Sequence, residues 1–258
     1  MVLEGGSGRP EGLTAASSVA DHLAAHILEQ LAPGSSLPSE AELAQHYEVS
    51  RLTIREAVKL LAGRGLLELA RGRRAVVREP NGSAFADFLT TLIQHDPKGI
   101  FDLVEVRKSL EIQSASLAAK HASRAALAAI EAALQGMRHA DAEWQSGRDP
   151  AGSELRFHEF DMGFHEALAL ASGNRVLTFL FEAMAGPLQE SFFISQRGQD
   201  IRGHTRADTV AAHERVLQAI VDGNSRKAAE AMRSHLENTE RDIRAAMSIL
   251  ATSRNAKG

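Results

Sequence analysis

Three histidines and one aspartate of this 258-residue chain fall where a helix would normally place apolar core residues. Asp161 and His165 are four residues apart in the segment 153–171, so their side chains would share one face of a helix. His213 and His235 each interrupt the apolar stripe of a later segment in the same way. Imidazole nitrogens and a carboxylate oxygen on facing helices form a donor set that suits a divalent transition metal.

Two hypotheses explain this pattern. In the first, Asp161 and His165 form a buried hydrogen bond, and the other two histidines are ordinary core residues. In the second, the four side chains bind one metal ion, Zn²⁺, Ni²⁺ or Mn²⁺. Helical bundles build metal sites from side chains on facing helices, so three histidines on separate helices favour testing the second hypothesis. Spacing alone leaves both open.

Arg107 is a cation on the apolar stripe of the segment 99–121. It could form an ion pair within its helix with Glu111, four residues further on. It could also bind the carboxylate of a small effector molecule, because a guanidinium group recognises a carboxylate through two parallel hydrogen bonds. The sequence does not choose between these two roles.

A second group of reactive side chains is basic and lies between residues 51 and 78. That span has eight basic and only two acidic residues, a net charge of +6 in a chain whose overall charge is −4. Such a concentration of positive charge is the electrostatic footprint of a phosphate-binding surface. The negative overall charge therefore does not argue against binding to nucleic acid.

Two short helices joined by a tight turn are predicted to position these basic residues. The first opens at residues 37–40 with Ser39 as its cap, and Ser50 is placed to cap a second helix that starts near Arg51. The second helix has an apolar face formed by Ile54, Ala57, Val58 and Leu61. With Arg and Thr at the start of its second helix, this pair is typical of a DNA-binding helix-turn-helix.

A β-hairpin is predicted directly after the helix-turn-helix. The runs 66–69 and 75–77 suit short strands, and the basic segment 71–74 forms the turn between them. A basic hairpin beside a recognition helix is the wing of a winged helix. The residues predicted to contact double-stranded DNA are Ser50, Arg51, Thr53, Arg55, Arg71, Arg73 and Arg74.

The rest of the chain predicts helices without alternating strand patterns. Beyond the first winged-domain helix at 17–32, helices are predicted at 84–95, 99–121, 123–146, 153–171, 174–196, 206–222 and 225–251, with 197–205 left undecided. The domain prediction is a flexible tail at 1–16, a winged helix-turn-helix domain at 17–79, a linker at 80–84 and an effector-binding and dimerisation domain at 85–251. The predicted fold class is mainly α: an N-terminal winged helix-turn-helix with a small β-hairpin wing, then an all-α antiparallel helical bundle.

Composition excludes some classes of protein. The chain has no cysteine, so neither a disulfide framework nor a thiolate metal ligand can exist. Hydrophobic residues make up 44% and charged residues 24%, as in an ordinary globular protein. No apolar run is long enough to span a membrane and no signal-peptide pattern is present, so we expect a cytoplasmic protein without membrane contact.

A stretch of about 60 residues that includes 36–78 resembles the winged helix of the GntR family of regulators. The matching residues are Pro33-Gly34, Leu37-Pro38-Ser39-Glu40, Glu42-Leu43-Ala44, Val49-Ser50-Arg51, Thr53-Ile54-Arg55-Glu56-Ala57 and Gly65-Leu66. Two positions depart from the family pattern, because Ala41 replaces an arginine that often reaches DNA and Arg74 replaces the glycine that usually ends the wing. The resemblance implies DNA binding, but the operator sequence cannot be copied from relatives.

Residues 85–250 resemble the FCD effector domain of the FadR subfamily of GntR regulators. Its metal-binding members carry an Asp-x-x-x-His motif, then His-Glu, then His-Leu. This chain matches them, in the same order, with Asp161 and His165, His213-Glu214, and His235-Leu236. The resemblance implies that Asp161, His165, His213 and His235 bind one metal ion, leaving coordination positions for water or an effector.

The same resemblance gives Arg107 a role. In FCD relatives an arginine in a Glu-x-Arg-x-x-x-Glu context, like Glu105, Arg107 and Glu111 here, often faces the ligand cavity. A metal and an arginine at one cavity suit a small carboxylate or hydroxycarboxylate. We therefore expect a homodimeric transcriptional regulator, not an enzyme, that binds a palindromic operator under the control of a small organic acid.

The same residues suit two other functions. Three histidines and an aspartate could activate water in a metal-dependent hydrolase or lyase fused to a DNA-binding domain. No general-base carboxylate stands out near the ligands, however, because Glu166 and Glu214 follow directly after histidines and should point elsewhere. A third possibility is a regulator in which the metal is purely structural. Such a protein would bind DNA without responding to an effector.

Overall fold

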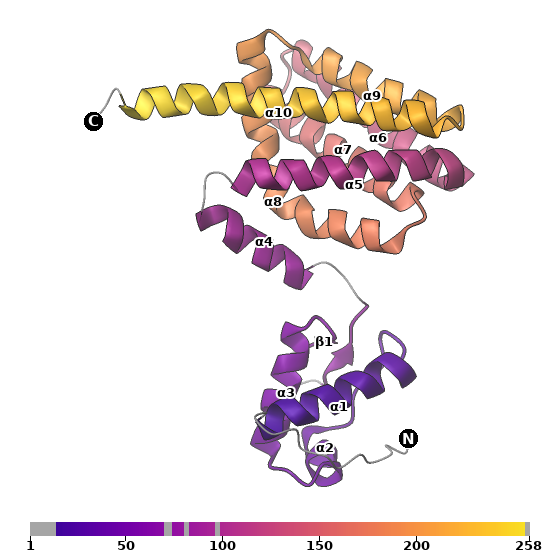
Figure 1. Cartoon of the computed structure of the whole chain (residues 1–258), viewed down its shortest axis with the longest axis vertical. Helices are drawn as coiled ribbons and strands as arrows, with labels where there is room; N and C mark the ends of the chain where they lie inside the picture. Colours follow the sequence, from indigo (N-terminus) through magenta and orange to yellow (C-terminus); the bar gives the residue numbers. More distant parts are fainter. Residues whose placement is uncertain (1–13, 70–73, 80–82, 96–98, 256–258) are drawn as a thin grey trace. The chain divides into compact units, whose positions relative to one another are not determined.

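The computed structural model describes residues 14–69, 74–79, 83–95 and 99–255. It has two compact units, Met1–Ala84 and Phe85–Gly258 (Figure 1). Most of the tail predicted at 1–16, the wing-tip residues Arg71 and Arg73, and residues 80–82 of the predicted linker lie outside the described residues.

The first unit contains the predicted winged helix. Its elements are α1 (Ala15–Gln30), α2 (Glu40–His46), α3 (Arg51–Gly63), β1 (Leu67–Glu68) and β2 (Val76–Val77). Both α1 and α2 pack against α3, so the helix predicted to read DNA is held by the other two. The buried core consists of Val19, Ala20, Leu23, Ile27, Leu37, Leu43, Ile54, Ala57, Val58, Leu61, Leu67 and Val77.

Side-chain caps set where the two helices of the helix-turn-helix begin. At α2, the backbone N–H of Ser39 donates to the Glu42 carboxylate over 2.7 Å, and the Glu42 N–H donates to Ser39 Oγ over 3.3 Å. At α3, the Thr53 N–H donates to Ser50 Oγ over 3.0 Å. These bonds satisfy N–H groups that a helix end would leave unpaired. The serine caps expected from the sequence are present at both helices.

The wing is a short antiparallel ladder. Leu67 of β1 pairs with Val77 of β2, and Glu68 pairs with Val76. The chain before α2 adds to its edge, since the Leu37 N–H donates to the Ala75 carbonyl over 2.8 Å. Leu67 and Val77 are buried and tie the hairpin to the core of the unit.

The regular elements among the described residues of the second unit are all helices. Its elements are α4 (Ser83–His95), α5 (Gly99–His121), α6 (Arg124–Gln145), α7 (Pro150–Ala171), α8 (Arg175–Arg202), α9 (Arg206–Val221) and α10 (Ser225–Asn255). In Figure 1, α10 runs alongside α5 and α9, and it also packs against α8. The largest core cluster takes apolar residues from α5, α6, α7, α9 and α10. The predicted fold class, a winged helix followed by a helical bundle, is confirmed.

Helix α8 is longer than the sequence predicts. It was predicted to end at residue 196, but it continues to Arg202 and is closed by Gly203, whose φ is +73°. Apart from Ile201, residues 197–202 are glycine or polar and form no apolar stripe, so we attribute their helical state to packing on α10. Gly198 lies so close to α10 that an added Cβ would stand 1.8 Å from the Asp242 carbonyl oxygen. Only a residue without a side chain allows this approach.

Helices α8 and α10 have 28 and 31 residues, more than a membrane span needs. Their length comes with many charged and polar residues. Within the described part of the chain, no helix combines the length and the apolar character required to cross a membrane.

Candidate functional site

The structure brings the three predicted histidines together. His165 of α7, His213 of α9 and His235 of α10 each offer a ring nitrogen within 4.8 Å of the others, and all three are buried. Asp161 lies one turn before His165, and its Oδ1 is 3.2 Å from His213 Nε2. Side chains from three separate helices thus converge in the core of the second unit.

Hydrogen bonds at the far side of two rings orient their free nitrogens. His213 Nδ1 donates to the Thr209 carbonyl oxygen over 2.8 Å, and His165 Nδ1 bonds to the Glu111 carboxylate. With a proton on each Nδ1, both Nε2 atoms keep a lone pair, and they lie 3.2 Å apart. Only a shared proton or a metal ion between them makes this arrangement favourable.

The distance between these two nitrogens fits a common metal ion. Bonds of about 2.1 Å to zinc place two adjacent ligand nitrogens roughly 3.0–3.4 Å apart. Partners such as Glu111 and the Thr209 carbonyl are the usual means by which proteins fix the tautomer of a metal-binding histidine. The residues present therefore fit a divalent transition metal.

Burial keeps two of the rings in the form that a metal requires. Burial lowers the pKa of His213 to about 4 and lowers the pKa of His235 well below its ordinary value. Both rings are therefore neutral near pH 7. A neutral imidazole binds metal without first losing a proton.

Glu111 is a buried carboxylate with two positively charged or polar neighbours. Burial opposes its ionisation, but Arg107 and His165 outweigh that effect and lower the pKa of Glu111 to about 2. Its side chain pairs with Arg107 Nε through one oxygen and with His165 Nδ1 through the other. One carboxylate thus positions both the predicted effector-binding arginine and a predicted metal ligand.

Arg107 forms one of the two interactions that the sequence left open, the ion pair with Glu111. Its Nε forms the expected ion pair with Glu111, and its guanidinium lies 5.0 Å from the centre of the Phe192 ring. Only 1% of the residue is exposed, yet Nη1 and Nη2 have no hydrogen-bond partner among the described residues. Buried donors without partners are costly, so these two nitrogens are poised for an anion.

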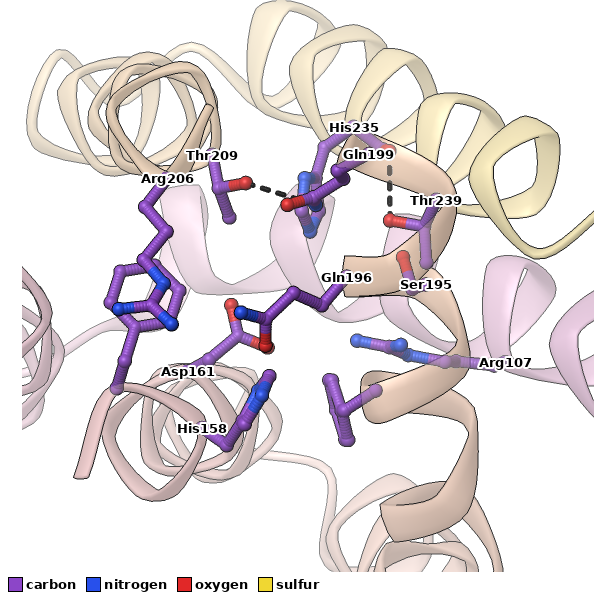
Figure 2. A pocket seen from close by; sticks show the side chains of 12 residues that line it. Arg107, His158, Asp161, Ser195, Gln196, Gln199, Arg206, Thr209, His235 and Thr239 are labelled. Carbon is purple, nitrogen blue, oxygen red and sulfur yellow. Dashed lines mark hydrogen bonds between the residues drawn. The ribbon is translucent and has the colours of Figure 1, made fainter. Parts of the chain in front are cut away.

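A cavity opens next to Arg107 and the histidines, and we call it the inner cavity. It is small, with a water-accessible volume of about 30 Å³. Figure 2 shows Arg107, Asp161 and His235 on its wall, together with neutral polar side chains. Its lining residues are Arg107, Phe157, His158, Asp161, Phe192, Ser195, Gln196, Gln199, Arg206, Thr209, His235 and Thr239.

Sequence reasoning missed several of these residues. Ser195, Gln196, Gln199 and Arg206 belong to the end of α8 and the start of α9, where the sequence has no clear apolar stripe. His158 is half-buried on the cavity wall, with its ring centre 4.8 Å from that of Phe193.

The predicted DNA-contact residues outside the wing lie at the N-terminal end of α3. Arg51 and Arg55 are exposed, Thr53 is half-buried, and Ser50 serves as the helix cap. The Arg55 guanidinium donates two hydrogen bonds, of 2.8 and 3.2 Å, to the Glu40 carboxylate. Such a fork holds the arginine in one direction at the surface.

Arg74 is the predicted wing residue that the structure describes. It is exposed, and its Nη2 lies 3.9 Å from Glu42 Oε2 in α2. This weak ion pair leaves the arginine accessible to a phosphate group. Arg71 and Arg73 lie outside the described residues, so their predicted DNA contacts remain predictions.

A winged helix with an exposed basic recognition helix, joined to a helical unit with a polar cavity, defines the class of ligand-responsive transcriptional regulators. Residues 15–77 match the family described as "Bacterial regulatory proteins, gntR family", and residues 102–238 match the FCD domain. The chain therefore belongs to the GntR family of bacterial regulators. Its pairing of a GntR winged helix with an FCD domain is that of the FadR-like subfamily predicted from the sequence.

Individual relatives agree with this assignment. The HTH-type transcriptional regulator LutR of Bacillus subtilis is 32% identical over 212 residues, which cover 82% of this chain and 92% of LutR. The Glc operon transcriptional activator of Escherichia coli K12 is 29% identical over 210 residues, 81% of each chain. Among solved structures, Streptococcus agalactiae GntR matches with a TM-score of 0.68 and 28% identity, covering 88% of this chain and 99% of that one. These relatives are regulators, so this chain is a DNA-binding transcriptional regulator and not an enzyme.

Proposed function

We propose that this protein represses transcription at a palindromic operator and releases it when a small organic acid binds in the inner cavity. The observation that carries the effector proposal is Arg107, whose two terminal nitrogens are buried at the cavity without partners among the described residues. A carboxylate would satisfy both nitrogens at once. It would also remove the cost of leaving two buried donors unpaired.

We infer that Asp161, His165, His213 and His235 hold one divalent transition metal, Zn²⁺, Ni²⁺ or Mn²⁺. The facing Nε2 atoms of His165 and His213, the fixed protons on their Nδ1 atoms and the purely nitrogen and oxygen donor set support this inference. Asp161 Oδ1 adds a buried oxygen without a hydrogen-bond partner in the described structure. When bound, the metal would supply a Lewis-acidic centre for an oxygen atom of the effector.

The neutral side chains of the inner cavity suggest a hydroxylated acid. Ser195, Gln196, Gln199, Thr209 and Thr239 line the cavity beside Arg107. Hydroxyl and amide groups both donate and accept hydrogen bonds, so they match hydroxyl groups of a ligand. This lining supports a hydroxycarboxylate more than a fatty acid, because a fatty acid chain would leave the buried Gln196 Oε1 without a hydrogen-bond donor.

Control of DNA binding requires that the effector bind two arrangements of the protein with different affinity. The ratio of those two affinities sets the upper limit on how far the effector can change the affinity for the operator. We infer a homodimer, because two recognition helices related by a two-fold axis match a palindromic operator. Since the operator lies on bacterial DNA, the protein works in the cytoplasm.

The test starts from DNA sequences selected by the full-length protein from a random library. Fluorescence anisotropy then measures operator affinity with and without a panel of hydroxycarboxylates, beside the metal content by elemental analysis. Arg107→Met should abolish the response to acids while keeping metal and DNA affinity. Arg138→Met is the control, because Arg138 forms an exposed pair with Glu214. A wild-type protein that binds DNA equally with every acid, although it holds metal, would support the structural-metal alternative and overturn the effector proposal.

The same assay decides the sign of regulation. The Escherichia coli Glc operon relative is named an activator, whereas repression relieved by the effector is the behaviour we propose here. A reporter gene behind the selected operator should be silent with the regulator alone and expressed once the acid is added. Expression that needs both the regulator and the acid would show activation instead.

A further inference from the structure

A second arginine reaches the inner cavity from another helix. Arg206 is the first residue of α9, is 8% exposed and lines the same cavity as Arg107. Its guanidinium carbon lies 4.5 Å from the centre of the Trp144 ring and 5.5 Å from that of Phe157. The faces of these rings stabilise the positive charge and hold the flat guanidinium in place.

The aromatic rings do not satisfy the hydrogen-bonding groups of Arg206. Its Nη1 is buried and has no hydrogen-bond partner within the described residues. Burial lowers the pKa of Arg206, and the acidic residues Glu154, Asp141 and Asp200 oppose this effect only through space. A cation that is costly to bury and has a free donor at a cavity is ready to bind an anion.

Arg107 and Arg206 lie across the inner cavity from each other, as Figure 2 shows. Both have buried terminal nitrogens without partners in the part of the chain that the structure describes. A ligand with a single carboxylate, bound at Arg107, would leave Nη1 of Arg206 without a hydrogen-bond partner among the described residues. A ligand with an anionic group at each end would satisfy both arginines.

We propose that the effector is a small dicarboxylic acid, with one carboxylate on Arg107 and the other on Arg206. This inference rests on the proposed function and narrows its ligand class. In Figure 2, Gln196 lies between the two arginines, and Gln199 lies beside Thr209, to which its Nε2 donates a hydrogen bond. The amide oxygens of both glutamines can accept hydrogen bonds from hydroxyl groups of the ligand backbone. Hydroxylated diacids therefore bind more tightly than plain diacids of equal length.

The test compares acids matched in length, using the full-length, metal-loaded protein. Isothermal titration calorimetry measures succinate against butyrate and malate against 3-hydroxybutyrate. Each dicarboxylate should bind at least about tenfold more tightly than its partner, because one extra charge-assisted contact commonly contributes that much. Equal affinity of the wild-type protein for both members of each pair would overturn the inference.

Variants of Arg206 test whether this residue causes the preference for dicarboxylates over monocarboxylates. Arg206→Met should remove the tenfold difference while leaving monocarboxylate affinity and metal content unchanged, and Arg206→Lys should retain part of it. Arg244→Met is the matched control, because Arg244 also lies over an aromatic ring, Phe101, but its side chain is 64% exposed. A preference that survives in Arg206→Met would overturn the inference. If no acid of either kind binds the wild-type protein, the proposed function itself fails.

Discussion

Replacing Glu111 by glutamine tests whether one carboxylate supports both halves of the candidate site. Glu111 is 1% exposed and pairs with Arg107 Nε and His165 Nδ1. Glutamine has almost the same shape but carries no charge. The substitution therefore removes the charge that balances Arg107 and leaves His165 without its anionic partner, with little change in packing volume.

The size of the effect follows from the ionisation of Glu111. The pKa of its carboxyl falls from an ordinary 4.5 to about 2, and each unit corresponds to about 1.4 kcal/mol. At pH 7 the carboxylate is ionised in both folded and unfolded chains, so the full difference of about 3 kcal/mol applies. Breaking a buried ion pair by removing one partner costs about 3–5 kcal/mol, which agrees with this value. For a unit of this size, Tm should fall by roughly 6–12 °C.

Thermal unfolding followed by circular dichroism at pH 7 with a chelator present measures this change. Glu214→Gln is the matched control, since Glu214 is paired with Arg138 but its side chain is 43% exposed. An exposed pair contributes at most about 1 kcal/mol, so the control should shift Tm by no more than about 2–4 °C. In a second experiment, titration with Zn²⁺ should show an affinity about 10–100 times lower for Glu111→Gln than for wild type.

Two results would refute this reasoning. If Glu111→Gln and Glu214→Gln unfold at the same temperature, the buried pair does not contribute what its environment implies. If Glu111→Gln keeps wild-type zinc affinity, the carboxylate does not position His165 for a metal. Loss of stability with full zinc affinity would leave Glu111 as a partner of Arg107 alone.

Three further predictions concern the DNA-binding surface, the metal site and pH. In anisotropy titrations, Arg55→Ala should weaken binding to the operator by about 1–3 kcal/mol but leave the affinity for random DNA unchanged. Arg64→Ala is the control, because Arg64 lies at the other end of the helix and pairs with Asp21. It should change neither affinity. His213→Ala should lose metal in elemental analysis, and the exposed His139→Ala should keep it; retained metal in the first variant would contradict the four-ligand site. The metal-free protein should lose up to about 3 kcal/mol of unfolding free energy as pH falls from about 7 to about 4. The reason is that His213 takes up a proton near its ordinary pKa of 6.5 in the unfolded chain, but only near 4 in the folded chain. Urea unfolding at several pH values measures this loss, and an unfolding free energy that does not change with pH would contradict the prediction.

The parts of the fold that depend on local signals were predictable. Ser39 and Ser50 cap the helices that they were expected to cap, because capping needs only residues within one helical turn. Asp161, His165 and His213 are buried as their positions on apolar stripes implied, because helical periodicity determines which face turns inward.

The parts that depend on contacts between helices were not predictable in the same way. Glu111 meets His165 from another helix, 54 residues away in the chain, and spacing revealed only its link to Arg107. The last turns of α8 are polar, and their helical state comes from packing on α10. Arg206 was missed for the same reason, since its role depends on Trp144 and Phe157 in other helices.

The contact of Gly198 with α10 has a consequence for how this protein can evolve. Any side chain at position 198 would collide with the backbone of Asp242, so mutations there should be removed by selection. Gln196 and Gln199, on either side of this position in the sequence, line the inner cavity. Descendants of a duplicated gene could therefore inherit the same helix crossing and acquire new effectors by exchanging these two glutamines.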